Sequence, residues 1–340
     1  MVALAVACGE AQPPAKSVND VGTVPNPPTC SARDVGFSVL LDGKSVWVFG
    51  DTLFSEPAND GFQWRSSTWS TTDPKAWASA AGGPFEHVLA ADGKPVQLLP
   101  HTEEEAAFNI ANKDAPRRKT PWPQAIVSDG DRAVIFYINM ETGPDGMWDF
   151  KSRSGSVAIW ESPESPAVRT EPPIFTGDEP DWGAAAVLVG TDLYAYACEG
   201  GISKPCKIAR VPFSSVTDRS AYRFFDGKTW SKEWRDAVSI FDGAPLFSVH
   251  KSDHHDAFVA IYMAPGGSEM RVRTAPAPEG PWSDARAFGE GMAAGDDMFD
   301  YALIAHPELA REGGAVDVVS YTRPTGPLRQ ETRLVEVRWR

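Results

Sequence analysis

The feature that most constrains the fold is an internal repeat with a period of about sixty residues. Five segments share one plan, in which an apolar strand, a tight turn and a second strand rich in aromatic and β-branched residues follow one another. The turns lie near residues 42, 129, 190, 253 and 313. Pairs of strands joined by Asp-Gly or Gly-Gly are strong hairpin signals, so each segment predicts one antiparallel hairpin.

The repeated units predict an all-β fold that closes on itself. Near-continuous apolar first strands indicate strands buried on both faces, and one hairpin is too thin to bury both. Five such units fit a five-bladed β-propeller. The longer first spacing predicts one insertion in the first blade, over residues 56–120 on the rim of the funnel. Within it, Thr102 and Glu105 form a capping-box pattern that predicts a short helix near 103–112. The alternating segment 331–340 can complete a blade and close the ring.

The start of the chain predicts export. Residues 1–8 form a short apolar run that ends at Cys8 and resembles the last part of a bacterial lipoprotein signal. Residues 9–29 are polar and proline-rich, which is typical of an extended tether, and the propeller domain is expected over 30–340. We therefore expect a cell-envelope lipoprotein or a secreted protein that meets a membrane only through a lipid on Cys8. A frayed terminus is the alternative.

Cysteine spacing and charge add two expectations. Cys198 and Cys206 flank a glycine-rich turn, so they could form a disulfide across a hairpin, which would leave Cys30 unpaired. The formal net charge of −14 argues against a nucleic-acid partner, because a phosphate backbone demands a basic surface. A polysaccharide partner, a monomer and no cofactor are expected.

Propeller geometry selects candidate site residues. The beginning of the first strand and the end of the second strand lie at the same mouth of the ring in every blade. Carboxylates recur at these positions with aromatic residues between them, a combination that binds sugar hydroxyls and sugar faces. The candidate catalytic residues are Asp34, Asp51, Glu199 and Glu141. The candidate substrate-binding residues are Trp122, Gln124, Asp181, Trp182, Asp297, Tyr301, Tyr321 and Arg323, and Tyr262 and Asp300 lie at the same mouth. Any one of these acids could instead be a turn or cap residue.

A second cluster of polar residues lies on the blade-four turn, at the end away from the funnel. It comprises His250, Asp253, His254, His255 and Asp256. Imidazole and carboxylate groups are metal ligands, so this cluster is either a metal site or a solvated loop. A solvated loop is the favoured interpretation, and no metal is assigned.

The ordered motifs resemble a known family. Asp34 to Ser38, followed by the run from Asp42 to Thr52 with its Gly-Asp-Thr end, is similar to the opening blade of the family of domain of unknown function 4185. Residues 271–282 and 306–323 resemble its last blades. The resemblance covers about residues 30–340 and implies a five-bladed propeller. Some members are endo-D-arabinanases in which two aspartates, corresponding here to Asp34 and Asp51, are implicated in catalysis.

The hairpin register predicts that Asp34 faces Asp51 or Thr52. Facing residues of an antiparallel pair have Cβ atoms only ~4.5–5.5 Å apart, so two carboxyls there would share a proton. An acid and a base in one site are what glycosidic cleavage needs. We therefore expect a glycoside hydrolase of the arabinan-cleaving type, with inversion favoured by analogy to related five-bladed glycosidases. The alternatives are a surface lipoprotein that only binds glycans and a scaffold for protein partners.

Overall fold

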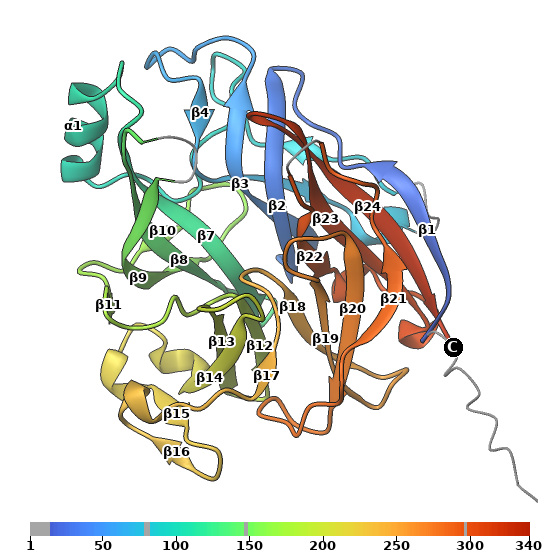
Figure 1. Cartoon of the computed structure of the whole chain (residues 1–340). Helices are drawn as coiled ribbons and strands as arrows, with labels where there is room; N and C mark the ends of the chain where they lie inside the picture. Colours follow the sequence, from blue (N-terminus) through green and yellow to red (C-terminus); the bar gives the residue numbers. More distant parts are fainter. Residues whose placement is uncertain (1–13, 78–81, 146–148, 296–297) are drawn as a thin grey trace, which may run out of the picture.

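The computed structural model describes residues 14–77, 82–145, 149–295 and 298–340, and these form five β-sheets around a central axis (Figure 1). The predicted all-β, five-bladed propeller is therefore confirmed. In each blade the first strand lies innermost. The innermost strands are β2 (Cys30–Leu41), β7 (Arg118–Ser128), β12 (Ala185–Val189), β18 (Ser248–Ser252) and β22 (Tyr301–Ala305). Each contacts the innermost strand of the next blade, and β22 contacts β2, so the ring is closed.

The outer strands complete the blades in chain order. Blade one adds β3 (Lys44–Phe54), β4 (Trp64–Arg65), β5 (Thr68–Thr72) and β6 (Glu86–His87). Blade two adds β8 (Ala133–Thr142), β9 (Phe150–Trp160), β10 (Val168–Arg169) and β11 (Phe175–Thr176). Blade three adds β13 (Asp192–Cys198), β14 (Pro205–Pro212), β15 (Arg223–Phe225), β16 (Trp230–Ser231) and β17 (Phe241–Asp242). Blade four adds β19 (Ala257–Met263), β20 (Glu269–Ala275) and β21 (Arg286–Glu290).

Blade five shows how the ring is closed. It contains β22, β23 (Val316–Gly326), β24 (Arg329–Trp339) and, outermost, β1 (Ala15–Thr23) from the start of the described chain. Segment 331–340 thus supplies the third strand and not the last one. The tether expected over residues 9–29 is wrong for residues 15–23, because their backbone pairs with β24 from Ala15–Trp339 to Thr23–Arg333. A polar edge strand that buries little apolar surface carries the same composition as a tether, which is why the sequence did not separate them.

The β2–β3 turn lies at the predicted Asp-Gly pair, whereas the β22–β23 connection differs from the prediction. At the β2–β3 turn, Asp42 and Gly43 both have positive φ angles, 50° and 71°, which is the type I′ combination that Asp-Gly supplies. The β22–β23 connection differs from a tight turn at Gly313-Gly314. It holds two short 3₁₀ helices, Pro307–Leu309 and Glu312–Gly314. The other 3₁₀ helices are Pro74–Trp77, Phe213–Ser215, Arg219–Ala221 and Trp234–Asp236.

The expected insertion contains both blade strands and added structure. Strands β4, β5 and β6 lie inside residues 56–120, so a large part of this segment completes blade one. The added part includes α1 (Glu103–Ala111), whose predicted capping box is present between Thr102 and Glu105. Asn109 of α1 exchanges two 2.9 Å hydrogen bonds with the backbone of Lys119 at the start of β7. The helix therefore lies at the mouth end of blade two, as expected for the rim.

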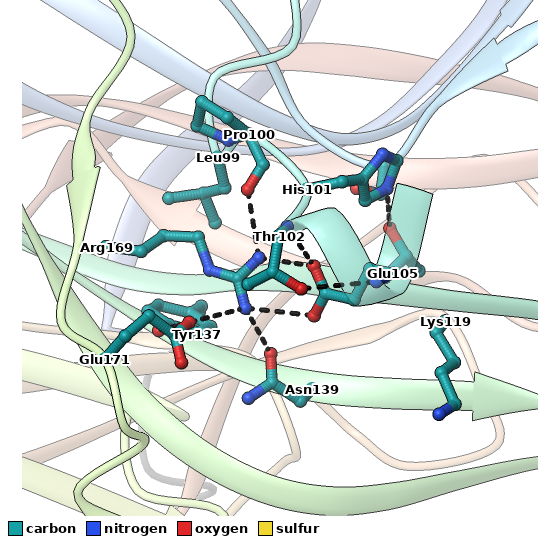
Figure 2. A network of polar contacts seen from close by, with 12 residues as sticks. Leu99, Pro100, His101, Thr102, Glu105, Lys119, Tyr137, Asn139, Arg169 and Glu171 are labelled. Carbon is teal, nitrogen blue, oxygen red and sulfur yellow. Dashed lines mark hydrogen bonds and ion pairs between the residues drawn. The ribbon is translucent and has the colours of Figure 1, made fainter. Parts of the chain in front are cut away.

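A buried ion-pair network attaches α1 to blade two (Figure 2). The Arg169 guanidinium of β10 donates to both carboxylate oxygens of Glu105, at 2.6 and 3.0 Å, and to Asn139 Oδ1 at 2.9 Å. It also contacts Glu171 at 3.0 Å and lies 4.9 Å from the centre of the Tyr137 ring. The side chains of Arg169 and Glu105 are only 6% and 12% exposed. A bidentate pair removed from water in this way fixes the orientation of the helix.

The cysteine expectations are confirmed. Cys198 at the end of β13 and Cys206 in β14 are directly paired in the sheet register and form a disulfide. Cys30 is free. Within the described ranges, no helix is long and apolar enough to cross a membrane.

Candidate functional site

The Asp34–Asp51 pair lies where the β2–β3 hairpin is irregular. Arg33 pairs with Thr52, but Val35 pairs with Phe49, so Asp34 stands opposite both Gly50 and Asp51. Val35 has a φ of 63°, which is unusual for a β-branched residue. β-bulges re-aim side chains and are frequent beside active sites. The predicted facing of Asp34 and Asp51 is thus met through a bulge and not through a regular ladder.

Gly50 makes room for the Asp34 carboxyl. A Cβ atom at position 50 would lie 2.4 Å from Asp34 Oδ1 and 3.3 Å from a methyl group of Val35. No real side chain tolerates such a contact, so any residue except glycine would displace the carboxyl. The Gly-Asp-Thr segment therefore does two things: Gly50 admits one carboxyl and Asp51 supplies the other.

Blade five, which adjoins blade one in the ring, holds Asp34 in place. Tyr301, the first residue of β22, donates a hydrogen bond from its hydroxyl to Asp34 Oδ2 at 2.9 Å. Thr322 of β23 accepts the backbone N–H of Val35 at 2.8 Å. Ring closure thereby brings together residues that are 267 and 287 positions apart in the chain. Tyr301 was predicted to bind substrate, and its contact with Asp34 gives it an orienting role.

The electrostatics of the Asp34–Asp51 pair favour one proton shared between the two carboxyls. Burial raises the pKa of Asp34 to about 6, while the hydrogen bond from Tyr301 and the backbone N–H of Asp51 lower it. Burial and then the negative charge of Asp34 raise the pKa of Asp51 well above its ordinary value. Because hydrogen bonds favour the ionised form of Asp34 and Asp51 lacks such support, Asp34 is the more acidic partner. Burial raises the pKa of Tyr301, so its hydroxyl remains a donor.

A second pair of acids lies at the same mouth in blade three. Asp181 precedes β12 and accepts the Ser152 hydroxyl at 2.6 Å, and Glu199 follows β13. Burial raises the pKa of Asp181. Partial desolvation and then the negative charge of Asp181 raise the pKa of Glu199, whose side chain is otherwise exposed. The structure thus brings these two predicted residues into electrostatic contact.

The other candidate residues of blades two and three divide by exposure. Trp122 is half-buried, and its ring lies 5.3 Å from that of Phe150, which is 38% exposed. By contrast, Gln124 and Trp182 are 7% and 1% exposed, and Trp182 packs on Phe224. Burial in the core leaves the latter two without a face for a sugar, so their predicted contact with substrate does not fit the structure.

Glu141 is engaged in ion pairs. It lies near the end of β8 and contacts Arg117 at 3.4 Å and Arg153 at 3.1 Å. These two guanidinium groups already occupy the oxygens of the Glu141 carboxylate. The geometry therefore favours a structural role for Glu141 over the predicted catalytic one.

The remaining candidates lie in or near blade five. Tyr321 is 1% exposed, and its hydroxyl accepts the backbone N–H of Met292. Arg323 donates to Glu331 at 2.9 Å and to the carbonyl of Ala293 at 2.8 Å. Both therefore serve the blade itself in this structure. Asp297 lies outside the described residues.

Sequence reasoning gave Asp300 too little weight. It lies just before β22 and is 1% exposed, and burial raises its pKa to about 6. A Cβ atom at position 291 would lie 2.7 Å from Asp300 Oδ2, so a second glycine makes room for a second carboxyl. Gly291 and Asp300 both lie in the connection between β21 and β22, and this nearby glycine was the sequence signal that could have drawn attention to Asp300.

The histidine cluster at the far end of blade four divides into a buried histidine and exposed side chains. His250 is buried, burial lowers its pKa to about 4, and its Nε2 atom lies 3.9 Å from Asp317. Asp253, His254 and Asp256 are exposed. No three His, Cys, Asp or Glu side chains among the described residues are arranged to hold a metal ion. His250 is thus a neutral core residue, and the exposed members form the expected solvated loop.

Solved structures with the same fold are distant in sequence. A protein from Bacteroides ovatus ATCC 8483, whose name assigns it provisionally to the hydrolases, is 13% identical with a TM-score of 0.62, over 93% of this chain and 87% of that chain. CoXyl43, a GH43 β-xylosidase/α-arabinofuranosidase from a compost microbial metagenome, is 14% identical with a TM-score of 0.54, over 94% and 95%. An α-L-arabinofuranosidase from Clostridium thermocellum ATCC 27405 is 13% identical with a TM-score of 0.51, over 85% and 82%. At these identities the likeness shows the fold alone.

A family profile matches most of the chain and identifies its family. No curated protein matches the chain at a significant level. The profile described as "Domain of unknown function (DUF4185)" matches residues 29–321, which include the bulged hairpin, Tyr301 and all five innermost strands. The chain therefore belongs to the DUF4185 family.

Proposed function

We propose that this protein is a glycoside hydrolase that cleaves an arabinan-type polysaccharide, with Asp34 as the base and Asp51 as the acid. The observation that carries the proposal is the facing of the two carboxyls across a bulged hairpin, with Tyr301 hydrogen-bonded to Asp34. The fold supports it, because propellers of this kind include a β-xylosidase/α-arabinofuranosidase. The resemblance to arabinan-cleaving members of the family supports the choice of polymer.

Burial and the charge of Asp34 support Asp51 as the carboxyl that carries the proton. Its pKa is raised by burial and by the charge of Asp34, so it is the neutral partner and can protonate the glycosidic oxygen as the C–O bond breaks. Asp34 keeps its charge through the Tyr301 hydrogen bond. It then either removes a proton from the attacking water or attacks the anomeric carbon itself. Carboxyl separations of ~6.5–9.5 Å go with the first course and ~5–5.5 Å with the second.

The disulfide supports a further proposal, that the protein is exported. Disulfides persist in oxidising compartments and are rare in the cytosol. The Cys198–Cys206 bridge fits such a compartment. Attachment through a lipid on Cys8 is proposed from the sequence alone, since Cys8 lies outside the described residues. Incorporation of radiolabelled palmitate into protein made from an upstream start would support it.

The test of the hydrolase is product release. Purified protein is incubated with arabinogalactan, lipoarabinomannan and plant arabinan, and oligosaccharides are separated by chromatography. We expect Asp34→Asn and Asp51→Asn each to reduce turnover at least ~100-fold, since each removes one partner of the proton transfer. Asp253→Asn, at an exposed turn on the far side of the ring, is the matched control and should keep the full rate.

Two outcomes would contradict this assignment. If the wild type releases no product from any of the three polymers, the protein is not an arabinan hydrolase. If the wild type is active and both variants keep near-normal rates, the acids lie elsewhere, and Asp181 and Glu199 are tested next. Proton NMR of the first-formed anomer distinguishes inversion from retention.

A further inference from the structure

A small cavity between blades three and four lies apart from the carboxyl pair. Its volume is about 230 Å³, and its walls include Ile202, Asp242, Tyr262, Arg271 and Arg273. Ile202 lies in the loop after β13, and Tyr262 lies near the end of β19. The second strands of all blades end at the same mouth, where Asp51 lies near the end of β3. This blade three–four groove therefore opens on the same face as Asp34 and Asp51, toward the rim.

Arg273 is a fixed cation in this groove. Its Nε atom donates to the Tyr262 hydroxyl at 3.0 Å, and its Nη1 atom donates to the carbonyl of Ser283 at 2.7 Å. No carboxylate of the described chain lies within ion-pair distance of it. Its guanidinium is thus held rigidly by neutral partners and keeps donor capacity for a ligand. Arg271 beside it pairs with Glu269 and is 41% exposed.

The opposite wall supplies an acceptor and an apolar edge. Asp242 of β17 is exposed and lines the same groove, so its carboxylate can accept hydroxyl protons. Ile202 is 89% exposed at the lip, on the loop that the Cys198–Cys206 disulfide closes. Ile202 lines the same groove as Arg271 and Arg273, so it supplies an apolar edge beside two guanidinium groups.

We propose that the blade three–four groove binds one sugar residue of an extended glycan, remote from the bond that is cleaved. Rigid guanidinium donors, a carboxylate acceptor and an apolar edge match the hydroxyls and carbon face of a sugar ring. The volume is below the ~300–1,000 Å³ of sites for larger ligands, which suits a single residue. The inference rests on the proposed function for the identity of the glycan, and it adds a preference for long chains.

The experiment compares polymer with short substrate. Arg273→Gln removes the fixed guanidinium, and Ile202→Ser changes only the exposed lip, so at least one variant retains the fold. Arg329→Gln, which removes an exposed arginine at the β23–β24 turn on the same face, is the matched control. We expect kcat/KM on plant arabinan to fall about tenfold in both groove variants. The shortest cleavable oligosaccharide should be cleaved at the wild-type rate.

A binding measurement makes the result independent of catalysis. Affinity electrophoresis in arabinan gels is run with Asp34→Asn protein, alone and combined with each groove variant. Retardation should weaken about tenfold with Arg273→Gln or Ile202→Ser and persist with Arg329→Gln. If the groove variants bind and cleave like the control, the subsite is wrong while the hydrolase stands.

The remaining outcomes separate the two proposals. If the Asp34→Asn protein binds arabinan through the groove but the wild type cleaves nothing, the subsite stands and the hydrolase falls. Equal losses on polymer and short substrate indicate a merely structural role and overturn the subsite. Absence of any binding by the protein with an intact groove overturns it as well.

Discussion

At the scale of single residues, the contact between Tyr301 and Asp34 sets the pH dependence. The hydroxyl stabilises the ionised form of Asp34, whose pKa is already raised to about 6 by burial. A base must be ionised to act, so activity should rise as pH increases through this value. The acidic limb of the pH–rate profile therefore reports on the carboxyl that Tyr301 touches.

We predict that Tyr301→Phe moves this limb to higher pH. Loss of a hydrogen bond to a charged group costs ~1.5–3 kcal/mol, and one pKa unit corresponds to ~1.4 kcal/mol, so the shift should be about one unit or more. Tyr222→Phe is the control, because its buried hydroxyl donates to the carbonyl of Val216 away from the carboxyls. The measurement is kcat/KM against pH, together with a ¹³C NMR titration of the aspartate carboxyls. An unmoved Asp34 titration would show that Tyr301 does not tune it.

Residue-level prediction succeeded where local geometry was enough. The pairing of Asp34 with Asp51 follows from the turn at Asp42-Gly43, and the bulge altered the register without separating the carboxyls. The surroundings of Trp182, Tyr321 and Arg323 could not be predicted, because strand position fixes the end of the blade and not the face or the partners of a side chain. Their burial and ion pairs depend on neighbouring strands that the sequence pattern does not specify.

At the scale of elements, α1 shows how an added segment is fixed to a blade. Glu105 closes the capping box of the helix through Thr102 and also binds Arg169 in blade two. The sequence predicted the helix from the first contact alone. The second contact joins residues 64 positions apart and could not be predicted from local pattern.

We predict that Arg169→Met detaches α1 and lowers the free energy of unfolding by ~3–5 kcal/mol, because it leaves Glu105 buried without its partner. Lys119→Met is the control. Its ion pair with Glu104 at 2.8 Å is solvent-exposed, so its loss should change the free energy of unfolding far less than the loss of Arg169. Urea unfolding measures the difference, and hydrogen exchange of residues 103–111 shows whether the helix is released. Similar losses for the two variants would contradict an anchoring role for the network in Figure 2.

At the scale of the whole molecule, the five-bladed propeller was predictable from the sixty-residue period of the sequence. The strand β1 that completes blade five was not predictable. Five apolar hairpins at regular spacing leave few other arrangements, and ring closure then brings Tyr301 to Asp34. The closing strand β1 was missed because its residues are mostly polar and its neighbours are prolines. Its stabilisation comes from backbone pairing with β24 and not from a hydrophobic pattern.

Strand β1 should stabilise the closed ring through its pairing with β24. In Figure 1, β1 lies along the outer edge of β24, and Arg340 donates a backbone hydrogen bond to Pro14 at 3.1 Å. Asp20 also forms an ion pair with Arg333 of β24. Removal of residues 1–23 would expose β24 as an unpaired edge strand, which both weakens blade five and offers a template for pairing with other chains. The matched control lacks only residues 1–13 and keeps the whole of β1.

We expect the control to unfold at the temperature of the full chain and the longer truncation to unfold at least ~5 °C lower, with concentration-dependent aggregation. Differential scanning calorimetry and light scattering measure the two effects. A synthetic peptide of residues 14–23 should bind the truncated protein by strand addition and restore part of the lost stability, since main-chain hydrogen bonds supply most of the contact. If the two truncated proteins unfold at the same temperature, β1 does not close the ring, and residues 15–23 act as the extended tether that their composition indicates.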